Sequence, residues 1–232
     1  MLVLGHRGDL TRHPQNTLAG FEAALSLGAD GVEFDVRRTL DRKLVIHHDP
    51  GPEQLTLSEL RLREPLVPTL AETLDLLKGR CLMNIELKTT MGINEVAKEV
   101  IGSCEPEEIV FSSFSAAALA LIADAAPMMR RGLLVGAKPH ATLPGRDILP
   151  WGRLRRANAR LLVVEHRFLA QIVPRAINRG VDVWSWNWYG ELCGSKRQVS
   201  TPEQINVGLA YGLEAVIVDR PPTPCYRAAG ES

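Results

Sequence analysis

The chain has 232 residues, of which 45% are hydrophobic and 23% are charged, and these ordinary proportions exclude a disordered tail, a collagen-like repeat and a coiled coil. Its 27 lysines and arginines balance its 27 aspartates and glutamates, so the formal net charge is zero. A zero balance argues against a surface built to neutralise nucleic-acid phosphates, and we expect no nucleic-acid partner.

Short apolar, β-branched runs alternate along the chain with segments of helical period, a pattern typical of a parallel sheet wrapped by helices. The eight runs span residues 2–4, 31–36, 82–87, 109–112, 132–135, 161–164, 181–186 and 215–218. Dividing 232 residues by eight runs leaves 29 residues for each unit of a strand, a helix and two turns. One unbroken series favours a closed (β/α)8 TIM barrel, typically of about 250 residues, over an open doubly wound sheet.

Helices are predicted between the runs, over residues 17–27, 69–77, 94–101, 116–125, 169–178 and 202–210. Asn16 is the expected N-cap of the first helix. Four of the helices are followed by a C-terminal glycine, namely Gly28, Gly79, Gly180 and Gly212. No linker rich in proline, glycine or serine divides the sequence, so we expect residues 1–232 to form one domain.

Cysteine usage and the N-terminal residues predict a reduced, cytoplasmic protein. The four cysteines have no C-x-x-C pair, which excludes the usual zinc spacing and a dense disulfide framework. Residues 1–5 lead straight into charged residues, without the apolar stretch of an export signal. The longest apolar segment, residues 116–126, falls short of the roughly 18 residues that a membrane helix needs.

Acidic residues occupy the strand ends at which such a barrel builds its function. Glu33 and Asp35 lie on the second predicted strand and share one face, because side chains alternate along a strand. Asn84, Glu86 and Lys88 share a face of the third strand in the same way. The apolar residues between them can face the helices, which turns the charged set toward the barrel mouth.

Three carboxylates that converge on a small volume cannot all stay ionised without a compensating cation. One divalent cation with oxygen ligands, Mg²⁺ or Ca²⁺, is the natural solution, and its predicted ligands are Glu33, Asp35 and Glu86. The alternative is an internal salt-bridge network in which the carboxylates pair with Arg7, Arg37 or Lys88. We favour the metal, because burying several ions for stability alone is usually unfavourable.

Two histidines are candidates for proton transfer beside this site. His6 follows the first predicted strand, and His48 lies in a short apolar segment that emerges into a turn. Imidazoles that titrate near neutral pH suit general acid and general base chemistry. If the segment is extended, His47 points away from the face that His48 occupies, so only one of these neighbours can face the site.

Six short motifs, in order along the chain, resemble the glycerophosphodiester phosphodiesterase family. They are His6-Arg7-Gly8, Pro14-Gln15-Asn16-Thr17, Glu33-Phe34-Asp35-Val36, His48-Asp49, Asn84-Ile85-Glu86-Leu87-Lys88 and Trp184-Ser185-Trp186-Asn187, and Val218-Asp219-Arg220-Pro221 ends the series. Each motif alone is weak. Jointly, they cover essentially the whole chain and are highly specific.

The resemblance implies a (β/α)8 barrel that hydrolyses glycerophosphodiesters to an alcohol and glycerol 3-phosphate with a divalent metal. Carried over by position, it assigns Glu33, Asp35 and Glu86 to the metal, His6 and His48 to acid/base catalysis, Arg7 and Lys88 to the phosphate, and Trp184 to the cleft wall. It leaves open which histidine is the acid. It also leaves open whether water or a glycerol hydroxyl attacks the phosphorus.

Departures from the family pattern bear on the substrate. Gln15 replaces the family's glutamate, which either is neutral, if the position only shapes the loop, or reduces the charge of the site. Residues 49–68 form a shorter segment than is usual in the family, and we expect a more open mouth. Trp184, Trp186 and Trp188 alternate along a strand, so they can share a face and form an apolar wall.

A basic stretch suggests contact with an anionic membrane. Residues 130–160 hold eight lysines and arginines against Asp147, which gives this stretch a formal charge of +7 and the rest of the chain −7. Apolar residues beside these arginines suit transient membrane-surface contact through residues 146–156. The alternative is a solvated basic loop in which Trp151 packs inward.

Three functions are compatible with these features. The first is hydrolysis of a small-molecule glycerophosphodiester. The second is a lysophospholipase D-type activity on a lysophospholipid, favoured by the short cover and the aromatic wall. The third is a catalytically silent barrel that binds a phosphorylated ligand, against which the full set of histidines and carboxylates argues. The sequence does not indicate the head group or the oligomeric state.

Overall fold

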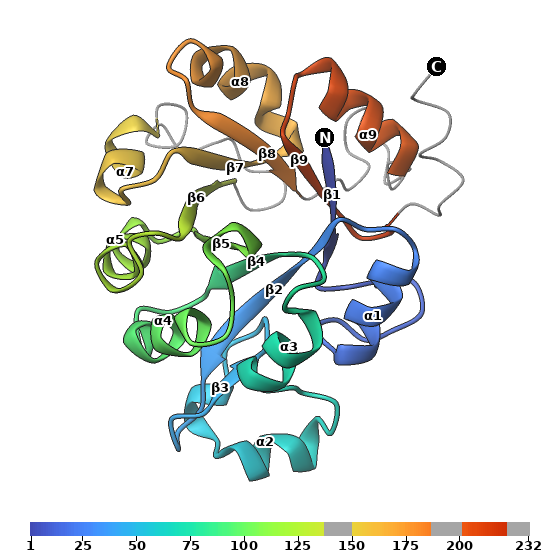
Figure 1. The fold of residues 1–232 in the computed structure, drawn as a ribbon, viewed down its shortest axis with the longest axis vertical. Helices are drawn as coiled ribbons and strands as arrows, with labels where there is room; N and C mark the ends of the chain where they lie inside the picture. Colours follow the sequence, from blue (N-terminus) through green and yellow to red (C-terminus); the bar gives the residue numbers. More distant parts are fainter. Residues whose placement is uncertain (137–149, 187–200, 222–232) are drawn as a thin grey trace.

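Eight parallel strands close into a barrel in this computed structural model, which describes residues 1–136, 150–186 and 201–221 (Figure 1). The strands are β1 Leu2–His6, β2 Gly31–Arg38, β4 Leu82–Leu87, β5 Ile109–Ser113, β6 Arg130–Val135, β7 Leu161–Glu165, β8 Asp182–Trp186 and β9 Ala215–Val218. The barrel closes because β1 pairs in parallel with both β2 and β9. The predicted (β/α)8 TIM barrel is confirmed; that residues 1–232 form one domain stays a prediction.

Helices cover the outside of the barrel in Figure 1. They are α1 Leu18–Ser26, α2 Leu57–Arg63, α3 Leu70–Leu77, α4 Ile93–Ile101, α5 Ala116–Ala125, α7 Trp151–Arg156, α8 Leu169–Ile177 and α9 Thr201–Ala210, with short 3-10 turns η1 Pro52–Gln54, η2 Pro106–Glu108 and η3 His166–Phe168. The six predicted helices are confirmed to within one residue at each end. Among the described residues, no helix is long and apolar enough to cross a bilayer.

Strand β3, Leu44–Ile46, is an addition that the sequence did not predict as a strand. It pairs antiparallel with the end of β2, where Arg38 faces Leu44. Behind it, Val45, Leu60 and Val67 form a small apolar cluster of their own. Residues 49–68, expected only as a short cover, therefore fold against β3 through helix α2.

The apolar core lies mainly between the sheet and the helices, where alternate strand residues such as Phe34, Ile85 and Phe111 are fully buried. Burying an apolar side chain of this size contributes about 1.5–3 kcal/mol. A second apolar cluster fills the barrel interior with Leu4, Val110, Leu134, Leu161, Val163, Trp184, Ala215 and Ile217. With the interior filled in this way, the polar residues of the inner face gather toward the carboxyl ends of the strands.

The loop before α1 differs from the expected cap. Thr17 caps the helix, since its Oγ1 accepts a hydrogen bond from the Gly20 N–H at 3.2 Å. Asn16 instead has a φ of 57° and donates its N–H to the Arg7 carbonyl, at 3.0 Å. Gly8 has a φ of 94°, and a Cβ there would lie 2.6 Å from the Gly20 carbonyl carbon, so this turn requires glycine.

The basic stretch is only partly described, since residues 137–149 lie outside the described residues. Trp151 packs against the core, and the guanidinium carbon of Arg179 lies 4.4 Å from its ring centroid. Trp151 therefore packs inward, which is the arrangement expected if this stretch is a solvated basic loop. Membrane-surface contact through residues 146–156 stays a prediction.

The structure describes two of the four cysteines. Cys81 and Cys104 are free thiols. Cys193 and Cys225 lie outside the described residues. Burial raises the pKa of the Cys81 thiol to about 12, so this group is an unreactive thiol at neutral pH.

Candidate active site

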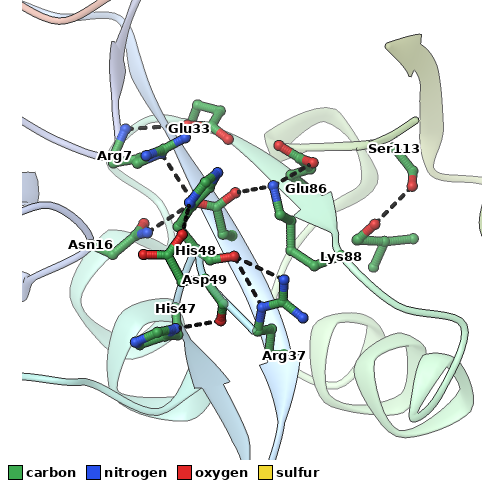
Figure 2. A network of polar contacts seen from close by, with 12 residues as sticks. Arg7, Asn16, Glu33, Arg37, His47, His48, Asp49, Glu86, Lys88 and Ser113 are labelled. Atoms are coloured by element: carbon green, nitrogen blue, oxygen red, sulfur yellow. Dashed lines mark hydrogen bonds and ion pairs between the residues drawn. The ribbon is translucent and has the colours of Figure 1, made fainter. Parts of the chain in front are cut away.

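Strands β2 and β4 bring three carboxylates together at the barrel mouth. Their register sets Asp35 opposite Glu86, while Glu33 lies two residues earlier on the inner face of β2. One oxygen from each carboxylate lies within 4.8 Å of the others. All three residues are buried, and Asp35 is 0% exposed. Figure 2 shows Glu33 and Glu86 directed toward the same region of the site.

Two cations hold the central carboxylate, Asp35. Arg7 Nε lies 3.2 Å from Asp35 Oδ2, and Lys88 Nζ lies 3.2 Å from Asp35 Oδ1 and 2.9 Å from Glu86 Oε1. The Asn16 amide donates a further hydrogen bond to Asp35 Oδ2, at 2.9 Å. Burial works to raise the pKa of Asp35, but Lys88 and Arg7 outweigh it and lower the pKa, so this group is ionised.

The charges of the other two carboxylates, Glu33 and Glu86, are not fully offset by the two cationic side chains. Burial, followed by the charges of Asp35 and Glu86, raises the pKa of Glu33 well above its usual value. Burial and the charge of Asp35 raise the pKa of Glu86 to about 7, although Lys88 opposes this. Arg7 and Lys88 supply part of the salt-bridge network that was the alternative to a metal, yet two cations do not balance three buried carboxylates.

The carboxylate cluster fits a hard divalent cation. Its donors are all oxygen, the ligand type that Mg²⁺ and Ca²⁺ prefer. Neighbouring Asn84 is 0% exposed, and neither of its amide atoms has a hydrogen-bond partner among the described residues. An orphaned buried amide costs about 1–3 kcal/mol, so this part of the site is built for a polar occupant.

Each of the two predicted histidines bonds through Nδ1 to a carboxylate. His6 Nδ1 lies 2.6 Å from Asp219 Oδ1, and its Nε2 lies 3.9 Å from Glu33 Oε2. His48 Nδ1 lies 2.8 Å from Asp49 Oδ1. Burial, together with the charges of Arg7 and Lys88, lowers the pKa of His48, so its ring is neutral at pH 7.

These groups line one pocket of about 120 Å³, which we call the metal pocket. Its lining is His6, Arg7, Glu33, His48, Asn84, Glu86, Lys88, Ser112, Phe114, Leu134, Trp186 and Ile217. The structure thus places six of the predicted site residues on one pocket, and Asp35 joins them through its bonds to Arg7 and Lys88.

Trp184 is the predicted site residue that lies elsewhere. Its side chain is 0% exposed inside the barrel, and its indole N–H donates to Glu214 Oε2 at 3.0 Å. Glu214 directly precedes β9, so this indole points toward the amino ends of the strands, away from the mouth. Trp186, two residues later on the same face, lines the metal pocket and packs edge-to-face on Phe114. Trp188 lies outside the described residues.

Three further residues support the site, although the sequence did not predict them as site residues. Asp219 orients His6, and Asn16 bonds Asp35. Gln15 accepts a hydrogen bond from Arg7 Nη1 at 2.6 Å, so glutamine keeps an acceptor for this guanidinium without adding charge. All three lie inside motifs of the family resemblance, which was the available signal, but their partners depend on how the loops fold.

A second pocket, of about 220 Å³, adjoins the metal pocket at His48, and we call it the side pocket. Its lining is Pro14, Gln15, Asn16, Thr17, Ile46, His47, His48, Glu64, Pro65, Leu66 and Val67. His47 faces this pocket and bonds through Nε2 to Glu64 at 3.1 Å and through Nδ1 to the Asp49 carbonyl at 2.8 Å.

Comparison with known proteins shows the family to which the chain belongs. Residues 6–223 match the glycerophosphoryl diester phosphodiesterase family. The chain belongs to this family, whose members are phosphoric diester hydrolases. A glycerophosphodiester phosphodiesterase of Caldanaerobacter subterraneus subsp. tengcongensis is 29% identical over 253 residues, which cover 96% of this chain and 95% of that protein.

Solved structures of the family share the fold. A phosphodiesterase of Oleispira antarctica, in complex with the product sn-glycerol-3-phosphate, superposes with a TM-score of 0.76 at 24% identity, covering 100% of this chain and 97% of that one. A glycerophosphodiester phosphodiesterase of Thermotoga maritima gives a TM-score of 0.72 at 23% identity, covering 94% of each chain. Because both identities are below 25%, these similarities show a shared fold only.

We expect the metal-free protein to bind Mg²⁺ or Ca²⁺ more tightly as the pH rises. Glu86, with a pKa of about 7, is protonated below that pH, and the cation must then displace its proton. One such proton weakens binding about tenfold between pH 8 and pH 6. Calorimetric titrations in buffers of different ionisation enthalpy measure both the affinity and the protons released.

The matched control is Glu86→Gln, which removes the titrating group. It is expected to bind the ion weakly and to lose the part of the pH dependence that Glu86 contributes, while Glu33, whose pKa is also raised, retains the rest. Equal affinity of the parent protein at pH 6 and pH 8, with no proton release, would contradict this description of the cluster.

Proposed function

We propose that this family member hydrolyses glycerophosphodiesters to an alcohol and glycerol 3-phosphate, with one divalent cation bound by Glu33, Asp35 and Glu86. The observation that carries the proposal is the metal pocket, in which two imidazoles lie beside a buried cluster of carboxylates and two cations. The activity named for the Caldanaerobacter relative, similar over nearly its whole length, supports the same reaction.

The pocket suits an anionic diester because it offers positive charge where the phosphate would lie. Arg7 and Lys88 line it, and their donors could contact phosphate oxygens once a bound cation takes over the charge of the carboxylates. A cation held by the carboxylates would supply further positive charge to the phosphate oxygens, where negative charge builds up during attack. The protein holds these groups in advance, so little reorganisation accompanies the reaction.

The two histidines suit opposite halves of the proton transfer. His48 is neutral at pH 7 because burial and nearby cations lower its pKa, so it is ready to accept the proton of the nucleophile, either water or a glycerol hydroxyl. His6 is bonded at Nδ1 to Asp219, which holds the ring with its Nε2 3.9 Å from Glu33 Oε2. We therefore propose His48 as the base and His6 as the acid that protonates the departing alcohol.

Chelation tests the dependence on metal. We expect excess EDTA to abolish turnover of glycerophosphocholine and added Mg²⁺ or Ca²⁺ to restore it, because the buried carboxylates would lack their counter-charge. Circular dichroism should show the fold retained. Full turnover by protein shown to be metal-free by elemental analysis would overturn this part of the proposal.

Alanine substitution tests the histidines. His6→Ala and His48→Ala should each lower kcat for glycerophosphocholine by at least about 10²-fold, the usual contribution of an acid or base. Their thermal stability should change little, since both side chains line the pocket and neither belongs to the apolar core. His47→Ala is the matched control and should retain kcat within about tenfold. A harmless His48→Ala beside a damaging His47→Ala would reverse the assignment.

The side pocket favours a second candidate substrate, a lysophospholipid. It opens beside His48, and its apolar lining residues are Pro14, Ile46, Pro65, Leu66 and Val67. An acyl chain that lies there gains about 0.8 kcal/mol per buried methylene, so three methylenes give about 2.4 kcal/mol, more than a tenfold preference. This pocket is the better candidate for the apolar wall, since Trp184 is not at the mouth.

Leu66→Ser tests this candidate, because Leu66 is 63% exposed at the pocket and tolerates a polar side chain. It should lower kcat/KM for lysophosphatidylcholine, assayed below its micelle concentration, and leave that for glycerophosphocholine unchanged. Leu62→Ser is the matched control, an exposed leucine of α2 outside the pocket lining. If glycerophosphocholine is the far better substrate and Leu66→Ser alters neither, the lysophospholipid candidate is wrong.

A further inference from the structure

Arg37 lies on the face of β2 that carries Glu33 and Asp35, yet it bonds elsewhere. The sequence made it a potential salt-bridge partner of the carboxylate cluster. Its Nε and Nη2 instead both donate to the His48 carbonyl, at 3.0 and 2.9 Å. Its Nη1 donates to Glu53 Oε1 at 2.7 Å. Figure 2 shows the guanidinium turned toward the His48 carbonyl.

Glu53 extends this contact to the rest of the turn. Its second carboxylate oxygen accepts a hydrogen bond from the Gly51 N–H, at 3.0 Å. Burial works to raise the pKa of Glu53, but the bonds from Gly51 and Arg37 outweigh it and lower the pKa, so the carboxylate is ionised. One guanidinium therefore ties the start of the turn, at His48, to its end at Glu53.

Arg37 is not placed to bind substrate. It is absent from the residues that line the metal pocket, although Glu33 of β2 and Asn84 and Glu86 of β4 line it. Its side chain is only 10% exposed, and the donors described above already have partners. A buried ion pair contributes little net stability, because desolvation offsets much of the attraction between its charges.

Among the described residues, the His48 ring makes one side-chain hydrogen bond. Its Nδ1 bonds to Asp49, whose side chain is 66% exposed, and an ion pair at the surface contributes little. The main chain on either side is better held: the His47 N–H donates to the Asp35 carbonyl at 2.9 Å, and Arg37 holds the next carbonyl. The direction of the imidazole therefore follows from how the peptide is anchored.

We propose that Arg37 and Glu53 are positioning residues for His48, which hold its main chain so that the imidazole faces the metal pocket. The inference rests on the proposed role of His48 in proton transfer. A misplacement of about 1 Å can cost about 10²-fold in rate, so loosening the turn should lower kcat while leaving substrate binding largely intact.

Kinetics on the full chain separate positioning from binding. Arg37→Met removes every donor and keeps an unbranched side chain, and it should lower kcat for glycerophosphocholine about 10- to 100-fold with KM changed less than about twofold. In the His48→Ala background, the same substitution should cause no further loss beyond about twofold, because its effect passes through His48. Glu53→Gln should give a smaller loss and serves if Arg37→Met does not fold.

The matched control is Arg38→Met. Arg38 is the next residue of β2 and pairs with Glu95, 3.4 Å away, and it should retain the parent kcat. Equal losses from Arg37→Met in both backgrounds would show that Arg37 acts independently of His48. A raised KM with an unchanged kcat would make Arg37 a substrate contact, and unchanged kinetics would show that the turn needs no clamp. Each of these three results overturns the proposal.

A spectroscopic measurement keeps this proposal distinct from the proposed function. In metal-free protein labelled with ¹⁵N-histidine, the His48 resonances, identified by their loss in His48→Ala, should shift or broaden in Arg37→Met and stay unchanged in Arg38→Met. Unmoved His48 resonances in Arg37→Met would overturn the clamp. If the parent protein hydrolyses no phosphodiester, the proposed function fails, and this measurement still decides whether Arg37 positions His48.

Discussion

The arrangement of the site at the barrel mouth depends on one constraint, which is that three carboxylates are buried beside only two cationic side chains. Arg7 and Lys88 both pair with Asp35, so most of the positive charge is placed beside this carboxylate. The pKa values of Glu33 and Glu86 therefore remain raised. Such an imbalance is unfavourable for folding alone. It becomes useful when a divalent cation, the one we propose, changes the net charge of the ionised cluster from −1 to +1, which suits an anionic substrate.

The segments around the cluster serve mainly to hold its members in place. Arg7 adopts a φ of 55° and Asn16 a φ of 57°, left-handed conformations that turn both side chains onto Asp35. For arginine this conformation carries strain, which the surrounding hydrogen bonds of the loop must offset. On the opposite side, the turn after β3 brings His48 to the same pocket. The last residue of β1 and the turn after β3 thus supply the two histidines, and β2 and β4 supply the carboxylates.

The periodicity of the sequence predicted the repeated strands and helices of the barrel. Features that depend on tertiary contacts were not predicted from it. Eight parallel strands were predictable because strands buried on both faces read as apolar runs, and the alternation along β2 and β4 predicted which carboxylates share a face. Helices α2 and α7 have seven and six residues, too few to show a helical period. The direction of Trp184 and the partner of Arg37 depend on neighbours distant in the sequence, Glu214 and His48. No local pattern encodes such choices.

The most direct test of the account is where a divalent cation binds. A crystal structure of the protein grown in Mn²⁺, examined by anomalous scattering, should show one peak within about 2.6 Å of oxygens from Glu33, Asp35 and Glu86. The bond from Lys88 to Glu86 should lengthen as the ion takes over its charge. A site without a peak at saturating Mn²⁺, with Arg7 and Lys88 still paired to Asp35, would contradict the claim that these carboxylates are kept together for a metal.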